Sequence, residues 1–422
     1  MILYHGEIFD DTEQDRLIIS LKDDLYIPFC LGKQLDRQTV INACDNLAQK
    51  VLRGSFDGII KPYLEMLSIT ESEFRSMVNL FLRENLEYKC RVELCDEEQI
   101  IGGKFIRQRY PLGVLMHIAA GNIDVLPAYS VIEGLLAGNI NILKLPAGDS
   151  GLSVTLLSEL ITAEPKLADY IYVFDVPSVE IQTLKKLAHY CDGVVVWGGD
   201  AAVAAARSIA GVSSKIISWG HKLSFAYADL SASDQDLKKL AAHICVTNQI
   251  LCSSCQGIFV NTNNRNEQNA FAERFFKILK AVNAEVGSAE FGMRAKNAIS
   301  IYNEKLEQHK THNTIFSDNG VSVICTDDKE LNLSYLYRNV WIKRLPLNEI
   351  IKTLKPYKGY LQTAGVLCPI ESKQKQICCS LAAAGVVRIT SAGNMSRTVS
   401  GEAHDGCYAL REYSRIVETE LF

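Results

Sequence analysis

A strand–helix–strand pattern beginning near residue 111 is the feature that most limits how this chain can fold. Residues 111–122 read as a buried strand that ends in small residues and an amide. Helical spacing follows over 124–136, and 140–144 read as a second apolar strand that ends in a lysine. Such a βαβ unit requires a parallel sheet. Ligands bind beyond the carboxyl ends of parallel strands, which is where Asn122 and Lys144 fall.

Length and periodicity together predict two α/β domains. A chain of 422 residues is too long for one compact core. Further strand–helix units begin at 170–176 and 193–196, and residues 216–220 lead into a second α/β domain, while 283–319 show no clear pattern. We expect a helical region and first α/β domain over 1–217 with a possible hairpin at 99–109, a second α/β domain over 218–390, and a segment over 391–422 that returns to the first domain.

Composition excludes several classes of protein. Hydrophobic residues make up 48% and charged residues 22%, which is typical of a globular protein. The net charge is −5 and no basic run marks a nucleic-acid surface. Residues 1–7 lack a signal pattern and no apolar stretch is long enough to span a bilayer, so we expect a cytoplasmic protein with no membrane span. The thirteen cysteines lack metal-ligand spacing, which predicts free thiols and no metal site.

Residues 247–260 are the strongest chemical signal. Cys252 lies on a small, polar turn that runs directly into an apolar β-branched segment. A thiolate there could attack a thioester or aldehyde carbon and later leave again. The alternative is a cysteine that packs as a small hydrophobe. Cys255 is a rival nucleophile, but the spacing to the strand at 259–260 favours Cys252, and we expect Cys255 to be a neighbouring packed thiol.

Several short motifs carry a resemblance to a known family. In chain order they are His117-Ile118 before Gly121-Asn122, Ala137-Gly138-Asn139, Ile142-Leu143-Lys144, Asn248-Gln249 before Cys252-Ser253-Ser254, Leu361-Gln362-Thr363, residues 385–389 and His404-Asp405-Gly406. From about residue 100 onward, the chain resembles the aldehyde dehydrogenase superfamily. Within it, the chain is most similar to the acyl-CoA (acyl-protein thioester) reductase branch, which includes the luminescence-type fatty acid reductase subunit.

The resemblance implies an α/β, aldehyde dehydrogenase-like fold with a Rossmann-like cofactor domain, a catalytic domain and an active site in the cleft between them. It places Lys144 at the adenosine ribose of a dinucleotide, and the turn Trp197-Gly198-Gly199 facing that dinucleotide. Ser218 is a further candidate cofactor residue. Three residues after the lysine stands Ala147, where NAD-specific members often carry a glutamate. The lack of that carboxylate favours NADPH, with NADH possible.

The same resemblance implies a mechanism. Cys252 would attack an acyl thioester, and the oxyanion would accept hydrogen bonds from the Asn122 amide and the Cys252 backbone N–H. A nicotinamide hydride would then release an aldehyde. Ser218 aligns with the glutamate that activates water in hydrolytic members, and no carboxylate lies between Asp200 and Tyr227. Because hydrolysis needs a water-activating base, this departure predicts reduction of a thioester.

Other assignments stay open. A second family glutamate would fall at 335–338, where the chain has none. His117, His221 and His404 are each either an acid or a packed imidazole. The substrate would be an acyl-CoA or acyl-protein of undetermined chain length, with an acyl-protein synthetase as a possible partner. In the superfamily a C-terminal strand joins the sheet of a neighbouring subunit, so the resemblance implies that residues 412–422 take part in a homo-oligomer, for which we expect a dimer. Alternatives are an acyl-phosphate reductase of the glutamyl-phosphate type and a weakly catalytic acyl-transfer partner.

Overall fold

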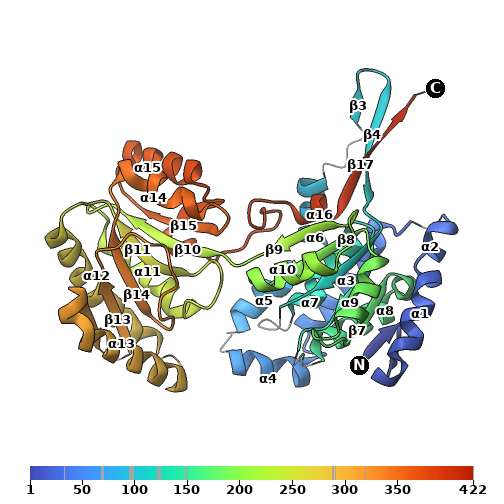
Figure 1. Ribbon diagram of the computed structural model, residues 1–422, viewed down its shortest axis with the longest axis horizontal. Coiled ribbons are helices and arrows are strands. Elements are labelled where there is room, and N and C mark those ends of the chain that lie inside the picture. Colours follow the sequence, from blue (N-terminus) through green and yellow to red (C-terminus); the bar gives the residue numbers. More distant parts are fainter. Residues whose placement is uncertain are drawn as a thin grey trace. The chain divides into compact units, whose positions relative to one another are not determined.

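The computed structural model (Figure 1) consists of two compact units. It describes residues 1–32, 34–67, 71–94, 99–120, 125–147, 149, 151–287, 289, 291–318 and 320–421. Unit 1 comprises Met1–Gly220 with Val399–Phe422, and unit 2 comprises His221–Thr398. The two units thus meet along the chain at 220/221 and 398/399. The sequence had led us to expect these boundaries at 217/218 and 390/391.

Unit 1 is built on a seven-stranded sheet of order β2-β1-β7-β6-β5-β8-β9. The five strands β7, β6, β5, β8 and β9 are parallel to one another. The short β1 pairs antiparallel with both β2 and β7. The order reverses between β5 and β8, which is the point where open α/β sheets bind ligands. The strands are β1 (Ile2–Tyr4), β2 (Glu7–Phe9), β5 (Val114–Ile118), β6 (Ile140–Lys144), β7 (Ile171–Phe174), β8 (Gly193–Trp197) and β9 (Lys215–Trp219).

Helices cover the sheet of unit 1 on both faces (Figure 1). The central α7 is buried along nearly its whole length, and at Gly134 it approaches β6 so closely that a Cβ would lie 1.8 Å from the Asn141 Oδ1. The helices are α1 (Gln14–Asp24), α2 (Ile27–Cys30), α3 (Arg37–Leu52), α4 (Asp57–Leu67), α5 (Glu71–Asn79), α6 (Arg83–Leu94), α7 (Leu126–Leu136), α8 (Leu152–Ala163), α9 (Ile181–His189), α10 (Asp200–Ile209) and α16 (Ala409–Glu412), with 3₁₀ turns η1 (Asp11–Glu13) and η2 (Pro165–Asp169).

A separate three-stranded antiparallel sheet completes unit 1. It consists of β3 (Gln99–Ile101), β4 (Phe105–Pro111) and β17 (Ser414–Glu420), with β4 in the middle. β3 and β4 form a hairpin over the segment for which a hairpin was expected. Since β17 pairs with β4 over its full length, the C-terminal segment returns to unit 1 (Figure 1).

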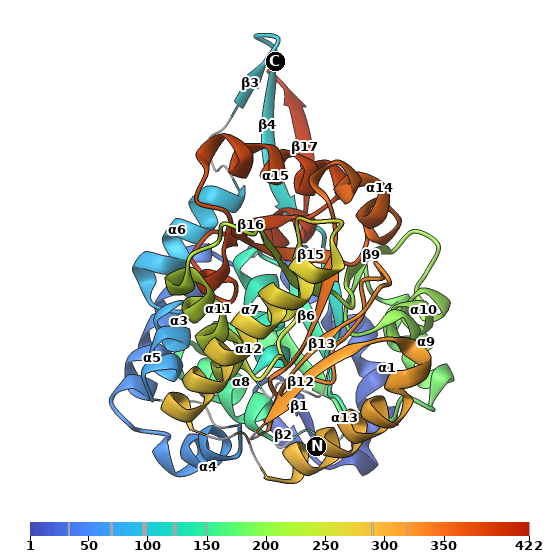
Figure 2. The same ribbon diagram turned by 90° about the vertical axis from the view of Figure 1, so that its left-hand side faces the viewer.

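Unit 2 is a second seven-stranded sheet, of order β12-β13-β14-β11-β10-β15-β16, parallel except for β12. One apolar core lies on the face covered by α11 and α12, and the other on the face covered by α14 and α15 (Figure 2). The strands are β10 (Leu223–Ala228), β11 (Cys255–Val260), β12 (Thr314–Asp318), β13 (Val321–Cys325), β14 (Asn339–Arg344), β15 (Leu361–Leu367) and β16 (Arg388–Ser391). The helices are α11 (Asp234–Thr247), α12 (Arg265–Val286), α13 (Phe291–Thr311), α14 (Ile350–Leu354) and α15 (Glu371–Ala384), with η3 (Leu347–Glu349), η4 (Lys355–Tyr357) and η5 (Ala392–Asn394).

The mixed α/β fold with two mainly parallel sheets agrees with the sequence prediction. The 283–319 stretch, which carried no clear pattern, contains α13 and β12. Residues 216–219 lie in β9, the edge strand of the unit 1 sheet, so Ser218 belongs to unit 1 and not to the second domain that was expected to begin there. Among the helices in the described part of the chain, none combines the length and apolar character needed to cross a membrane.

Candidate active site

Cys252 occupies the middle of a tight turn at the entrance to β11. The Ser254 N–H donates to the Leu251 carbonyl at 2.9 Å, and the Ser254 hydroxyl accepts from the Leu251 N–H at 3.1 Å. Both bonds hold the two central residues of the turn outward. Cys252 is accordingly exposed, whereas the strand that follows it is fully buried. The turn therefore presents the thiol on a rigid base.

The Cys252 turn is fastened to two neighbouring strands. The Gln362 side-chain amide, on β15, donates to the Cys252 sulfur at 3.4 Å. The Ser224 hydroxyl, on β10, donates to the Cys252 carbonyl at 2.7 Å and accepts from the Thr363 N–H at 3.1 Å. These bonds fix the sulfur relative to the amino ends of β10 and β15. The sequence marked residues 361–363 as a motif but gave no role to Gln362.

Gln249 braces the same turn from inside. Asn248 and Gln249 both adopt left-handed backbone angles, with φ of 46° and 64°, and so end α11 sharply. The buried Gln249 amide donates to the carbonyls of Cys255 and Asn339, each at 3.0 Å, while its oxygen accepts from the Asn339 N–H at 3.0 Å. One side chain thus ties the start of β11 to β14 and sets where the Cys252 turn begins.

Cys255 is packed as a small hydrophobe. It has no exposed surface, and its thiol donates to the Gly257 carbonyl at 3.2 Å. Burial raises the pKa of Cys255 to about 12, so the thiol is neutral at physiological pH. Its backbone N–H faces the Nε2 of His243, whose own pKa burial lowers to about 4. Of the two cysteines in the CxxC pair, only Cys252 is exposed to solvent.

A buried arginine lies where the family's second glutamate was sought. Residues 336–338 form three successive left-handed positions, with φ of 59°, 46° and 72°. The Arg338 guanidinium donates to the Asn248 side chain at 3.2 Å and the Cys245 carbonyl at 3.1 Å, and also bonds the Asn283 side chain and the Gly287 carbonyl. Arg338 therefore holds the end of α11, and with it the loop that leads to Cys252.

The candidate dinucleotide residues lie in unit 1, at the carboxyl ends of its strands. Lys144 is the last residue of β6 and is 5% exposed. Its ammonium donates to the Ser178 hydroxyl at 3.0 Å. Burial lowers the pKa of Lys144, and the nearby carboxylate of Asp175 acts in the opposite direction. The side chain is held in place, and it offers donors of the kind that ribose hydroxyls require.

The glycine turn follows β8 at the point where the strand order reverses. Gly198 has a φ of 156°, and a Cβ there would come within 2.9 Å of Ala202. Gly199 is the N-cap residue of α10, and a Cβ added to it would meet nothing within 4 Å. Open space at a helix N-terminus fits a pyrophosphate. Asp200, the first residue of α10, opposes an anion there and is the one feature that does not fit.

Trp197 and Ser218 differ in their environments. The Trp197 indole is buried and donates to the Ser130 hydroxyl at 2.9 Å, so it leaves only its backbone for a dinucleotide. Ser218 is exposed on β9, opposite Val196 in register. Asn122 falls at 121–124, outside the described residues. Lys144, Gly198, Gly199 and Ser218 are thus in unit 1, and Cys252 is in unit 2.

The histidines left open by the sequence have distinct surroundings. His117 is fully buried between the Ser130 hydroxyl at 2.7 Å and the Asn141 side chain at 3.0 Å, and burial lowers its pKa to about 4. It is therefore a neutral part of the core. His404 packs its ring against Trp197 and Trp219, and His221 is exposed. Within the described residues, no three His, Cys, Asp or Glu side chains are grouped so that they could hold a metal.

The fold is that of the aldehyde dehydrogenase class. It is similar to glyceraldehyde-3-phosphate dehydrogenase GapN of Methanocaldococcus jannaschii, solved with NADP, at a TM-score of 0.72 and 13% identity, covering 97% of this chain and 94% of that one. It is also similar to the Δ1-pyrroline-5-carboxylate dehydrogenase of Mycobacterium tuberculosis, at a TM-score of 0.66 and 14% identity, covering 99% and 83%. At such identities the likeness shows the fold alone.

Sequence comparison gives the family within that class. The acyl-CoA reductase (LuxC) family matches residues 34–416, and the chain belongs to this family. The long-chain acyl-protein thioester reductase of Aliivibrio fischeri is 25% identical over 368 residues, which are 85% of this chain and 73% of the relative. The Vibrio harveyi enzyme of the same name is 25% identical over 349 residues, which are 77% and 68%. The family and the branch predicted from the sequence are confirmed, and the chain is an oxidoreductase.

Proposed function

We propose that this chain reduces a long-chain acyl thioester, carried on CoA or on a protein, to an aldehyde, with Cys252 as the nucleophile. The observation that carries the proposal is the exposed Cys252 thiol, held by Gln362 in a turn braced by Gln249, in a member of the acyl-CoA reductase family. The Aliivibrio fischeri and Vibrio harveyi relatives are both named for the same reaction class.

The chemistry requires bonds that these residues are suited to make and break. The Cys252 thiolate forms a bond to the acyl carbon. The bond from that carbon to the sulfur of CoA or of the carrier breaks, and the electron pair leaves with that departing sulfur. The Gln362 amide steadies the attacking sulfur. The developing oxyanion accepts hydrogen bonds from the Asn122 side chain and the Cys252 backbone N–H. The product of this half-reaction is a thioacyl-enzyme.

A nicotinamide dinucleotide fits the groups at the strand ends of unit 1. Lys144, positioned by Ser178, would hold the adenosine ribose, and the space beside Gly199 would receive the pyrophosphate. When bound, the cofactor supplies a hydride equivalent to the acyl carbon. NADPH is preferred because Ala147 places no carboxylate against a 2′-phosphate. Ser218 stands where hydrolytic members carry the glutamate that activates water. Because a serine cannot act as that base, reduction is the expected outcome.

A carrier-bound substrate would require docking of the protein that supplies it, and an acyl-protein synthetase is the partner that the family resemblance implies. The small β3-β4-β17 sheet leaves β3 and β17 as edge strands among the described residues, and an edge strand is a site for pairing with another chain. A homodimer formed through this sheet is the proposed oligomer.

The test is aldehyde formation by purified variants. With dodecanoyl-CoA and NADPH, the unaltered protein and Cys379→Ala, which changes another exposed thiol, should both oxidise NADPH and form dodecanal. Cys252→Ala should form none. Acylation without aldehyde would instead indicate an acyl-transfer partner, and full activity of Cys252→Ala would refute the nucleophile assignment.

A further inference from the structure

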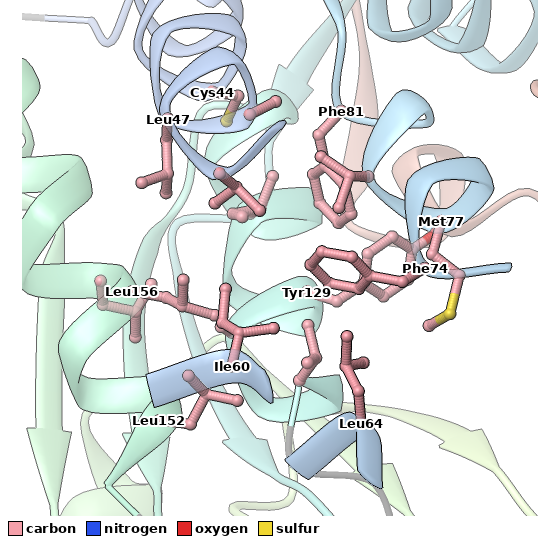
Figure 3. Close-up of a pocket in the computed structure, with 17 residues that line it drawn as sticks. Cys44, Leu47, Ile60, Leu64, Phe74, Met77, Phe81, Tyr129, Leu152 and Leu156 are labelled. Atoms are coloured by element: carbon pink, nitrogen blue, oxygen red, sulfur yellow. The ribbon is translucent and has the colours of Figure 1, made fainter. Parts of the chain in front are cut away.

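An apolar cavity of about 150 Å³ lies inside unit 1. Five helices enclose it: α3, α4 and α5 from the N-terminal region, with α7 and α8 of the sheet-covering layer. Figure 3 shows the labelled side chains of these helices pointing toward a shared centre around the Tyr129 ring. Protein interiors contain few voids larger than a water molecule. A cavity of this size therefore suggests a ligand-binding site.

The described residues of the wall offer no polar side-chain group to a ligand. Tyr129 directs its hydroxyl away, donating it to the Glu133 carboxylate at 2.8 Å, and presents only its ring. Cys44 is the other lining residue with a polar atom, and burial raises the pKa of its thiol to about 12, which keeps it neutral. The remaining lining residues are aliphatic side chains, Phe and Met. Such a surface is suited to a hydrocarbon and excludes a charged head group.

The size of the cavity matches a segment of a hydrocarbon chain. An apolar cavity of about 150 Å³ elsewhere stays dry and binds benzene, so it accepts about six carbons. At α5 the wall is thin, because Met77 lines the cavity and is yet 44% exposed. A flexible chain with about six carbons enclosed would fit this space.

The cavity begins close in sequence to the oxyanion residue of the proposed mechanism. Val125, at the N-terminus of α7, lines the cavity and stands three residues after Asn122. Three trans peptide links limit the separation of their Cα atoms to about 11 Å. A carbonyl bound at Asn122, as proposed above, would therefore lie close to the residue at which the cavity wall begins.

From these observations we infer that the cavity binds the hydrocarbon tail of the acyl substrate and sets the preferred chain length. The inference rests on the proposed function for its substrate. Each enclosed methylene should raise affinity about fourfold. The gain should continue while carbons fill the cavity and then level off.

The direct test uses saturated alcohols of 4 to 14 carbons, titrated calorimetrically into the full chain without cofactor. Affinity should rise about fourfold per methylene to a plateau. Ala48→Phe, which fills the cavity from α3, should remove the rise. Leu157→Ala should move the plateau two to three carbons longer. Leu160→Ala is the matched control, since both leucines are fully buried on α8 but only Leu157 lines the cavity.

The outcomes separate the cavity from the reaction. An affinity that ignores chain length, or equal plateaus in Leu157→Ala and Leu160→Ala, would show a void between helices and overturn the inference. The same variants are then assayed with butanoyl- to tetradecanoyl-CoA and NADPH. Reduction with a length profile that Leu157→Ala leaves unchanged would refute the inference and keep the proposed function. Cavity-dependent binding of alcohols without reduction of any thioester would refute the proposed function alone.

Discussion

Thiol labelling should distinguish the two cysteines of the CxxC pair by more than three orders of magnitude. A free cysteine has a pKa of about 8.5, so about a tenth of an exposed thiol is thiolate at pH 7.5. The pKa of Cys255 is about 12, which leaves about three thiolates in 10⁵. Only the thiolate reacts with iodoacetamide, and Cys255 is also fully buried. Cys252 should therefore react at the rate of an exposed thiol such as Cys379, and Cys255 at least a thousandfold more slowly.

The assay is a time course at pH 7.5 with proteolysis and tandem mass spectrometry, because Cys252 and Cys255 fall in one tryptic peptide and only fragmentation separates them. Cys379 provides the internal reference for an exposed thiol. Labelling of Cys255 within tenfold of Cys252, in folded protein, would refute the reasoning. In that case the β11 strand would open readily, and the assignment of the nucleophile would have to be reconsidered.

Four further predictions follow from single contacts. Gln249→Ala should lower the free energy of unfolding by about 3 kcal/mol in urea titration, because its buried side-chain hydrogen bonds, three of them at 3.0 Å, are lost. Gln38→Ala, at an exposed position, should change the free energy of unfolding by less than about 0.5 kcal/mol. Equal effects of the two substitutions would contradict the structural role of Gln249. Lys144→Met should weaken NADPH binding about 10- to 100-fold by fluorescence titration, and no change would remove Lys144 from the cofactor site. Ala147→Glu should shift preference toward NADH by about tenfold in the ratio of kcat/KM values, through repulsion of the 2′-phosphate, and an unchanged ratio would contradict the NADPH assignment. The pKa of His117 is about 4 in the folded chain and about 6.5 when unfolded. The free energy of unfolding should therefore include the full contribution of the neutral imidazole above pH 6.5 and lose about 3 kcal/mol of it as the pH drops to 4. A His117→Asn variant whose stability keeps the full dependence on acid pH would contradict this.

The sheets were predictable from sequence because their strands repeat a strong local pattern. The apolar runs at 114–118, 140–144 and 193–197 are buried at nearly every position, as parallel strands covered on both faces must be. The strands β1 and β2 escaped prediction because three residues are too few to show a period. Their place in the sheet depends on antiparallel pairing with β7, far away in sequence.

The contacts around Cys252 could be predicted only in part. The motif around residues 361–363 was visible, but its bond to the sulfur joins residues 110 positions apart, and no local pattern encodes that pairing. Trp197 shows the opposite case. Its place before a glycine turn suggested a dinucleotide contact, whereas tertiary packing directs its indole to Ser130. Sequence thus located the strand ends, and packing decided which side chains remain available there.

The central claim is that one sulfur carries the acyl group, and trapping that adduct tests it most directly. The protein is incubated with tetradecanoyl-CoA in the absence of a nicotinamide cofactor, quenched in acid, digested and mapped by mass spectrometry. The account predicts one tetradecanoyl group per chain, on Cys252, which is lost with release of tetradecanal when NADPH is added before the quench. An acyl group on a different residue, or aldehyde formation by Cys252→Ala, would contradict it.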